Sequence, residues 1–283
     1  MNWTTLVSAE ALARVPADEP LRLIDARFSL ADADAGRRGY GAGHLPGAHY
    51  ADLDRDLSDL SKAAEGRHPL PDEPRFAHAL GRWGVDPRQQ VVVYDAGDGS
   101  MAAARLWWLL KLMGHDNVAV LDGGLEAWRA QGLPTTTAIP RQAPTAPYPA
   151  RFDRARIAQA DEVLARLQER GGWLLDARAP ERYRGEVEPI DPVAGHVPGA
   201  VNRPFAHNLR AGRFKPADEL RDQLAPLLHG HAPRDAVLMC GSGVTACHLL
   251  LAFEHAGLCG ARVYAGSWSG WIDDASRPVA RGE

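Results

Sequence analysis

Hydrophobic positions along the chain alternate between short continuous apolar runs and longer stretches with helical spacing. In the first half, apolar runs of strand length occupy residues 21–24, 91–94 and 118–121, and helical spacing occupies residues 75–83 and 102–113. The second half predicts strands at residues 173–175, 236–239 and 262–264, and a helix over residues 244–255. Strands that are apolar on both faces and joined by helices predict an α/β fold, with a parallel sheet flanked by helices.

The chain also repeats itself once. Four landmarks of the first half return in the same order in the second: residues 23–27 as 175–178, residues 43–48 as 195–200, residues 91–95 as 236–240, and residues 123–128 as 266–271. The second pair reads Gly-His-X-Pro-Gly-Ala in both copies. Such ordered self-similarity predicts two tandem domains of the same fold.

The boundary between the two halves follows from a change in composition. Residues 132–148 contain four prolines among threonines and alanines, without regular periodicity: Pro134, Pro140, Pro144 and Pro147. Proline fixes φ and removes a backbone donor, so this stretch predicts an extended linker. We therefore expect a first domain at 1–135, a linker at 136–149 and a second domain at 150–283.

Composition narrows the function classes. Of the 283 residues 45% are hydrophobic and 24% charged, and the net charge is −4, without the basic surplus that nucleic-acid binding requires. No apolar run approaches the ~20 residues of a membrane span. The first residues lack the pattern of a secretory signal, so a cytoplasmic protein is expected. The sequence shows neither a metal-ligand cluster nor a nucleotide-binding loop, so no cofactor is expected, and a monomer is compatible with it.

The three cysteines lie close together near the end of the chain, at Cys240, Cys247 and Cys259. An odd, clustered set does not suggest a disulfide framework, and it fits a reducing compartment. Cys247 falls within the predicted helix and Cys259 beyond its end, so both are interpreted as structural. Cys240 is different because it ends a predicted strand and precedes a glycine-rich turn.

The loop that begins at Cys240 has the composition of an anion-binding nest. Its sequence is Cys240-Gly241-Ser242-Gly243-Val244-Thr245. Ligands of open α/β sheets bind beyond the carboxyl ends of strands, and the glycines let backbone N–H groups turn inward. These donors and the start of the following helix favour a thiolate. We expect Cys240 to be a nucleophile toward sulfur, and the loop to hold the resulting persulfide.

Asp95 occupies the equivalent position in the first half, in the loop Asp95-Ala96-Gly97-Asp98-Gly99-Ser100. A carboxylate cannot carry a sulfane sulfur. The first half is therefore expected to be a catalytically inactive copy that supports the second. Two further repeated features, the Asp25–Arg27 and Asp176–Arg178 pairs, predict internal ion pairs at strand ends, and Trp268 and Trp271 predict packing beside the loop.

At these residues the sequence resembles the two-domain rhodanese superfamily, over about residues 21–271. The resemblance rests on the repeated Gly-His-X-Pro-Gly-Ala segments, on Asp95 in place of a cysteine, and on the loop from Cys240 to Thr245. Within the superfamily this loop is most similar to that of the 3-mercaptopyruvate sulfurtransferases. Thiosulfate sulfurtransferases of the vertebrate type carry Arg and Lys after the cysteine, whereas Gly241 and Ser242 are neutral.

The resemblance implies roles for several residues. Ser242 matches the serine that helps polarise the donor and relay a proton, His44 matches a first-domain histidine, and Asp32 or Asp34 would be its acidic neighbour. Two arginines of these enzymes hold the α-keto acid. Arg182 matches the first, but Asp191 stands where the second is expected, so Arg184 or Arg203 would have to substitute. The expected donor-binding set is Arg182, Gly241, Gly243, Val244 and Thr245.

The resemblance thus implies a sulfurtransferase that moves sulfur from 3-mercaptopyruvate through a Cys240 persulfide to a thiol acceptor such as thioredoxin, or to cyanide. Two alternatives remain open. Because Asp191 replaces the second arginine, thiosulfate remains a possible donor, which would make the chain a thiosulfate:cyanide sulfurtransferase. A persulfide-binding or protein-interaction module without turnover is the other, although retention of Cys240 and Ser242 argues against it.

Overall fold

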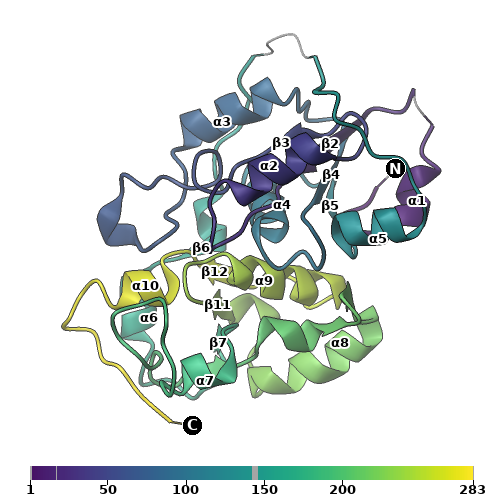
Figure 1. The fold of residues 1–283 in the computed structure, drawn as a ribbon. Helices are drawn as coiled ribbons and strands as arrows, with labels where there is room; N and C mark the ends of the chain where they lie inside the picture. Colours follow the sequence, from purple (N-terminus) through teal and green to yellow (C-terminus); the bar gives the residue numbers. More distant parts are fainter. Residues whose placement is uncertain (1, 17, 142–145, 283) are drawn as a thin grey trace. The chain divides into compact units, whose positions relative to one another are not determined.

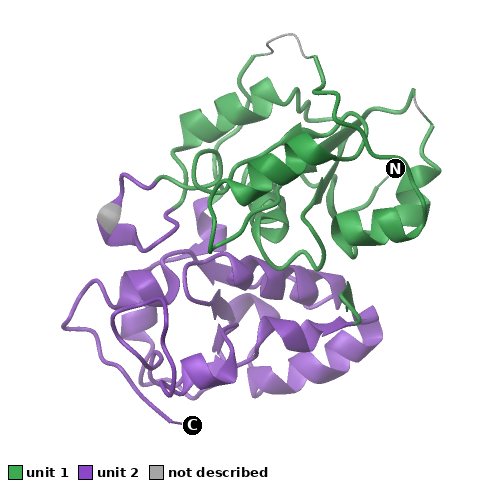
Figure 2. Cartoon of the chain, in the orientation of Figure 1, with its two compact units in different colours: residues 1–59, 70–153, 211–214 green, residues 60–69, 154–210, 215–283 purple. Residues whose placement is uncertain are grey.

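A computed structural model describes residues 2–16, 18–141 and 146–282. The chain divides into two compact units (Figure 2). Unit 1 comprises residues 1–59, 70–153 and 211–214, and unit 2 comprises residues 60–69, 154–210 and 215–283. Each unit contains a five-stranded sheet and helices around it (Figure 1).

Unit 1 is built on a parallel sheet with the strand order β1-β5-β4-β2-β3. Its strands are β1 (Leu6–Val7), β2 (Leu21–Asp25), β3 (His49–Tyr50), β4 (Gln90–Tyr94) and β5 (Val118–Leu121). Its helices are α1 (Ala9–Ala13), α2 (Ala35–Ala42), α3 (Glu73–Arg82), α4 (Ala102–Leu112) and α5 (Gly124–Ala130). All five residues of β4 are buried, which explains its continuous apolar sequence.

Unit 2 repeats this arrangement with the order β6-β12-β11-β7-β8, again parallel. Its strands are β6 (Ile157–Ala158), β7 (Leu174–Asp176), β8 (Val201–Asn202), β11 (Val237–Met239) and β12 (Arg262–Tyr264). Its helices are α6 (Ala160–Ala165), α7 (Pro180–Tyr183), α8 (Ala217–Leu224), α9 (Thr245–His255) and α10 (Ser267–Trp271). The strand orders of the two sheets correspond one to one, so the predicted α/β fold with two parallel sheets is confirmed.

The short strands β9 (Leu209–Arg210) and β10 (Arg213–Phe214) form a separate two-stranded sheet. The central strands and the helices predicted from the hydrophobic pattern match their observed counterparts to within two residues at each end. The pattern did not predict the two-residue strands β1, β3, β6 and β8, because a run of two residues is too short to show a period.

Both halves use the same internal ion pair at the end of a central strand. In unit 1 the Arg27 guanidinium binds the Asp25 carboxylate, with Nη2 2.6 Å from Oδ2, and donates to the Gly43 carbonyl at 2.8 Å. In unit 2 Arg178 binds Asp176 at 2.7 Å and the Gly195 carbonyl at 2.8 Å. Both aspartates are fully buried. The predicted structural ion pairs are confirmed.

The compact units include two segments that the order of the chain would assign to the opposite half. Residues 60–69 belong to unit 2, although they come from the first half, and residues 211–214 belong to unit 1. The boundaries at 135 and 150 that composition suggests stay a prediction. Of the four linker prolines, Pro144 lies outside the described residues.

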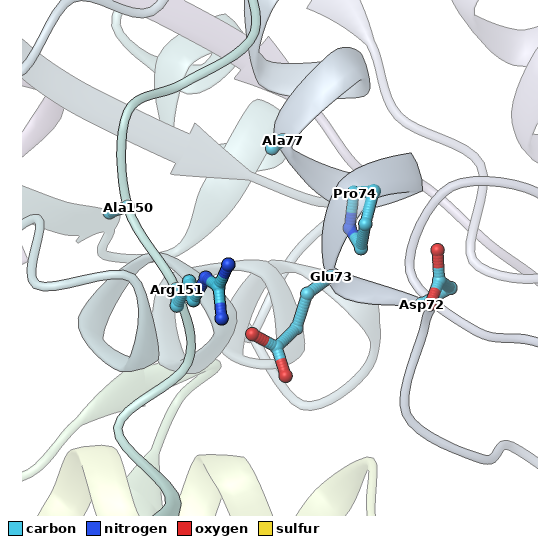
Figure 3. A pocket seen from close by; sticks show the side chains of 6 residues that line it. All are labelled: Asp72, Glu73, Pro74, Ala77, Ala150 and Arg151. Atoms are coloured by element: carbon cyan, nitrogen blue, oxygen red, sulfur yellow. The ribbon is translucent and has the colours of Figure 1, made fainter.

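A pocket of about 360 Å³ lies in unit 1, lined by Asp72, Glu73, Pro74, Ala77, Ala150 and Arg151 (Figure 3). The Glu73 and Arg151 side chains extend toward one another across it, from α3 and from the segment at residue 150 (Figure 3). None of these residues belongs to the set predicted to carry chemistry. Among the helices of the described residues, none combines the length and apolar character needed to span a membrane.

Candidate functional site

Cys240 follows the last residue of β11 and is 2% exposed. Its Sγ accepts a hydrogen bond from the Gly243 backbone N–H at 3.2 Å, and α9 begins two residues later at Thr245. An N–H donor and the positive end of an eleven-residue helix both stabilise negative charge on sulfur. The strand end, the turn and the helix thus adopt the arrangement expected from the sequence.

The backbone of the loop is held by the first three residues of α10. Ser267 Oγ accepts from the Cys240 N–H at 3.1 Å and donates to the Tyr264 carbonyl at 2.9 Å. The N–H groups of Trp268 and Ser269 donate to the carbonyls of Cys240 and Gly241 at 2.9 and 2.8 Å. The N–H and C=O groups of Cys240 and the C=O group of Gly241 are therefore all hydrogen-bonded, and these bonds fix the backbone orientation of Cys240.

Gly243 is required for the shape of this loop. Its φ of +76° lies in the left-handed region, and a Cβ there would lie 2.2 Å from the Ala265 carbonyl oxygen. The clashing atom belongs to the backbone, which cannot move aside as the end of a flexible side chain can. The Gly243 N–H that reaches the sulfur is thus available only in a conformation that a side chain would prevent.

Ser242 contacts a histidine that the sequence analysis did not select. Its Oγ lies 2.8 Å from Nδ1 of His68, and both residues are buried, with exposures of 7% and 4%. The two residues are separated by 174 positions in the chain. A hydroxyl with a histidine partner can pass a proton in either direction, which is the ordinary chemistry of general acid–base catalysis.

The segment that carries His68 is anchored to unit 2 by its backbone. A Cβ at Gly66 would lie 2.6 Å from the Gly266 carbonyl oxygen, so the chain passes against the start of α10 at a distance that only glycine allows. The next N–H, that of Arg67, donates to Ser269 Oγ at 2.9 Å. These contacts fix the direction in which the Arg67 and His68 side chains project.

His44, which the resemblance implied as the catalytic histidine, has a packing role within unit 1. It is fully buried, its ring stacks on Tyr40 with centroids 3.9 Å apart, and its two ring nitrogens lie 2.8 and 3.3 Å from the carbonyls of Tyr40 and Ala138. His196 repeats the arrangement in unit 2, stacked on Tyr183 at 3.8 Å. The structure thus places His44 in packing contacts that both halves share, and it places His68 beside the loop; a catalytic role for either histidine stays a prediction.

The acidic neighbours suggested for His44 are also engaged elsewhere. The Asp32 carboxylate pairs with Arg38, and 47% of its side chain is exposed. That pair lowers the pKa of Asp32, chiefly through the Arg38 hydrogen bond. Asp34 is exposed and precedes α2 without a side-chain capping bond. Neither has a contact with the His44 ring, whose nitrogens face backbone carbonyls.

Arg182, on α7, lies beside the loop as the sequence predicted. Its Nη1 and Nη2 would be 3.5 and 3.6 Å from a Cβ at Gly241. Its Nε and Nη2 bind the Glu188 carboxylate in a bidentate pair at 2.7–3.2 Å, and Nη2 also lies 3.1 Å from Asp191. Burial by itself would raise the pKa of Glu188, but the bonds from Arg182 and two backbone N–H groups outweigh it and lower that pKa.

Arg184 and Arg203 are the two residues that the sequence offers in place of the arginine expected at position 191. Arg184 binds the partly exposed Glu186 at 2.7 Å. Arg203 binds Asn208 and Gln223 at 3.0–3.1 Å. The guanidinium that does approach the loop is that of Arg67, whose Nη2 would be 3.2 Å from a Cβ at Gly241. The recorded side-chain partners of Arg184 and Arg203 lie outside the loop, whereas Arg67 approaches it.

The other residues singled out from the sequence lie in the loop, in α9 or shortly after it, or in the core of unit 2. Val244 is 4% exposed and its carbonyl accepts from the Cys247 N–H at 3.0 Å, and Thr245 is the first residue of α9. Cys247 is fully buried and its thiol donates to the Gly243 carbonyl at 3.1 Å, whereas Cys259 is exposed. The three cysteines form no disulfide. Trp268 and Trp271 are fully buried in the core of unit 2.

The equivalent loop of unit 1 is filled by its own side chain. Asp95 is buried, and its Oδ1 accepts from the N–H groups of Gly97 and Gly99 at 3.2 and 3.0 Å. Burial raises the pKa of Asp95 to about 6. The backbone N–H groups of this loop thus bind the Asp95 carboxylate, whereas in unit 2 the Gly243 N–H binds the Cys240 sulfur.

Unit 1 also contains a counterpart of His68. Phe214 of the segment 211–214 lies against this loop, with a ring carbon 3.7 Å from a Cβ at Gly99, and its N–H donates to Asp122 at 2.9 Å. Each loop is therefore contacted by a segment from the opposite half of the chain, with histidine at one and phenylalanine at the other. This difference between the repeats is the sequence signal that could have identified His68, since a histidine stands at the cysteine loop and a phenylalanine at the aspartate loop.

Among the described residues, no group of three or more His, Cys, Asp or Glu side chains has the arrangement of a metal site. The arrangement around Cys240 instead combines a thiol, a hydroxyl–histidine pair and two guanidinium groups. Such an arrangement is suited to a sulfur nucleophile assisted by proton transfer and anion binding.

Known proteins with similar sequences share the whole length of the chain. A probable 3-mercaptopyruvate sulfurtransferase of Pseudomonas aeruginosa is 47% identical over 286 residues, covering 100% of both chains. The 3-mercaptopyruvate sulfurtransferase of Homo sapiens is 39% identical and covers 93% of this chain and 89% of its own. Thiosulfate sulfurtransferases of two rodents are matched at 35 and 36% identity.

The solved structures agree with these relatives. The crystal structure of SseA from Escherichia coli, described as a 3-mercaptopyruvate sulfotransferase, has a TM-score of 0.80 and 32% identity, and the match covers 94% of this chain and 100% of that one. The family model of the rhodanese-like domain matches residues 8–131 and 159–274. These two matches correspond to the two sheets described above, and the chain belongs to the rhodanese family as a protein with two rhodanese-like domains.

Proposed function

We propose that this protein is a sulfurtransferase that takes sulfur from 3-mercaptopyruvate onto Cys240 and passes it to a thiol or to cyanide. The observation that carries the proposal is the loop around Cys240, where the Gly243 N–H contacts Sγ and His68 contacts Ser242 Oγ. Relatives at 47% and 39% identity carry the same activity in their names, whereas two others at 39% identity are named putative thiosulfate sulfurtransferases.

In the first step the Cys240 thiolate attacks the sulfur of the donor. A sulfur–sulfur bond forms, the carbon–sulfur bond of the donor breaks, and its electron pair passes to carbon, so that pyruvate leaves as the enolate. The Gly243 N–H at 3.2 Å stabilises the thiolate before attack and the persulfide after it.

Protonation makes the enolate a better leaving group. Ser242 is the hydroxyl of the loop, and its Oγ lies 2.8 Å from His68. The Ser242 hydroxyl supplies the proton and His68 replenishes it, so a charged intermediate need not accumulate. The donor thiol must lose its own proton as well, and the same pair can accept it.

The charge around the loop favours a donor with a small negative charge. Arg182 and Arg67 approach Gly241, but Glu188 and Asp191 neutralise them within the same cluster. Thiosulfate is a dianion and would need an excess of positive charge, whereas mercaptopyruvate needs a place for one carboxylate and one keto oxygen. A guanidinium offers two parallel N–H groups for such a planar group.

In the second step an acceptor thiolate, or cyanide, attacks the outer sulfur of the Cys240 persulfide and restores the thiolate. A small thiol and a protein thiol such as thioredoxin are both chemically competent. Because the enzyme alternates between two covalent states, its kinetics should be ping-pong.

The test compares the two donors on the purified protein. With mercaptopyruvate and a thiol acceptor, the kinetics should be ping-pong and kcat/KM should exceed that for thiosulfate by about tenfold or more, equivalent to ~1.4 kcal/mol of transition-state binding. A preference for thiosulfate would show that the donor is wrong, while sulfur transfer itself stands. A Cys240→Ser protein that retains full turnover would overturn the enzyme assignment and leave an interaction module.

A further inference from the structure

Two arginines from distant parts of the sequence turn toward the same point above the loop. A Cβ built on Gly241 would lie 3.2 Å from Arg67 Nη2 and 3.5 Å from Arg182 Nη1. Because Gly241 has no side chain, both guanidinium groups can lie close to the loop backbone next to Cys240. Three guanidinium nitrogens within 3.6 Å of one position are an unusual concentration of donors.

Asp191 holds the two arginines in this arrangement. Its Oδ1 pairs with Arg67 Nη1 and its Oδ2 with Arg182 Nη2, and the carboxylate is 3% exposed. Each arginine therefore uses one terminal nitrogen for Asp191 and directs another toward Gly241. A buried carboxylate between two guanidinium groups is itself well compensated, because each oxygen has a cationic donor.

Arg67 has donor capacity that the protein does not use. Its Nε is buried and has no hydrogen-bond partner among the described residues. Its backbone position is fixed by the Arg67 N–H bond to Ser269 Oγ at 2.9 Å. A guanidinium of fixed position with unused donors is suited to a ligand that supplies oxygen acceptors.

We propose that Arg67 is the second donor-binding arginine of this protein and that Asp191 is the positioning residue that holds Arg67 and Arg182 as a pair. The pair binds the carboxylate of an α-keto acid, with Arg67 Nη2 and Arg182 Nη1 each meeting one oxygen. This assignment rests on the proposed function and names the residue that performs its donor recognition. Asp191 then stands where an arginine was expected because the charge comes from Arg67 instead.

The binding part is tested with pyruvate, which carries the carboxylate and keto group but no sulfur. Calorimetry would measure its Kd for the wild type and for Arg67→Gln, Arg182→Gln and Arg184→Gln. We expect Kd to rise about tenfold in the first two variants, from the loss of one charge-assisted pair, and to stay unchanged in Arg184→Gln, which removes an arginine of the same helix region. Wild-type protein without affinity for pyruvate, or an Arg67→Gln protein with wild-type Kd, would overturn the assignment.

The positioning role of Asp191 has its own readout. Removing a negative charge should by itself tighten anion binding, so a purely electrostatic Asp191 predicts a lower Kd in Asp191→Asn. A positioning Asp191 predicts a higher Kd, because the two guanidinium groups lose their bridge and repel one another. Arg67→Lys, which keeps the cation beside Asp191 but loses the fork, should resemble Arg67→Gln, and it serves as the second variant if the latter does not fold.

These outcomes separate the inference from the proposed function. If pyruvate binding weakens in Arg67→Gln but the wild type does not turn over mercaptopyruvate, the arginine pair stands and mercaptopyruvate is refuted as the donor. If the wild type turns over mercaptopyruvate and Arg67→Gln keeps both its KM and the pyruvate Kd, the function stands and the role of Arg67 is refuted.

Discussion

Nδ1 of His68 lies 2.8 Å from Oγ of Ser242, and both residues are buried beside the loop that begins at Cys240. The pair joins a segment of the first half of the sequence to the glycine-rich loop of the second. In unit 1 the corresponding segment presents Phe214 to a loop whose cysteine position is Asp95. A thiol at the start of the loop and a histidine beside it are therefore both found in unit 2 and not at the corresponding positions of unit 1.

Substitution of the two histidines should separate catalysis from packing. His68→Asn removes the ring that exchanges a proton with Ser242, so kcat with mercaptopyruvate should fall by about 10²-fold or more. His44→Asn should retain kcat per folded molecule but lower the stability by ~1–3 kcal/mol, because its ring stacks on Tyr40 and meets two carbonyls. Steady-state kinetics and thermal unfolding on both variants check this. The reverse pattern would restore His44 to the catalytic role.

Cys240 should be the residue that carries sulfur, and Cys247 should not. Incubation with mercaptopyruvate and no acceptor should add the mass of one sulfur atom to the wild type and to Cys247→Ser, but not to Cys240→Ser. The Cys247 thiol donates to the Gly243 carbonyl at 3.1 Å, a bond that a serine hydroxyl can also make. Mass spectrometry of the intact protein and of its peptides locates the added sulfur. A persulfide found on Cys247 would contradict the assignment.

A side chain at Gly243 should lower the stability by more than the strain of a left-handed backbone conformation alone, because it would also clash with the backbone. A Cβ would lie 2.2 Å from the Ala265 carbonyl, so Gly243→Ala should cost more than ~3 kcal/mol and abolish turnover. Gly199 provides the matched control, because its φ of +79° is close to the +76° of Gly243, while a Cβ at Gly199 would meet no atom within 4 Å. Gly199→Ala should cost only ~1 kcal/mol. Urea unfolding of the two variants compares them, and equal losses would refute the steric explanation.

The buried Asp95 should make stability depend on pH. Burial raises its pKa from 3.8 to about 6, so the folded state favours the protonated form. Its contribution to stability is present at low pH and is lost as the pH rises from 3.8 to about 6, by roughly 3 kcal/mol at most. Asp95→Asn does not titrate, so it should gain stability relative to the wild type over that interval.

Urea unfolding at pH 4.5 and at pH 7.5, two values chosen to lie roughly on either side of that transition, measures the difference. Asp116→Asn, at a carboxylate whose side chain is 71% exposed, is the control for a general change of charge and should show little pH dependence relative to the wild type. An Asp95→Asn variant whose relative stability is the same at both pH values would contradict the raised pKa.

The sequence by itself determined the features that depend on local order. The apolar runs identified the central strands, the repeat identified the two sheets, and the strand–cysteine–glycine order identified the loop, since each is encoded by neighbouring residues. The pairs Asp25–Arg27 and Asp176–Arg178 were predictable for the same reason, because their partners are two positions apart.

Only the tertiary structure decided which residues meet that loop from elsewhere. His68 is 174 positions from Ser242, and Arg67 is 124 positions from Asp191, so no spacing along the chain relates them. His44 was the better-marked residue because it lies in a repeated motif, yet repetition marks what the two folds share, which is packing. The segment at residues 60–69 packs in unit 2 through Gly66 and the Arg67 backbone, and that packing brings a histidine and a guanidinium to the sulfur loop.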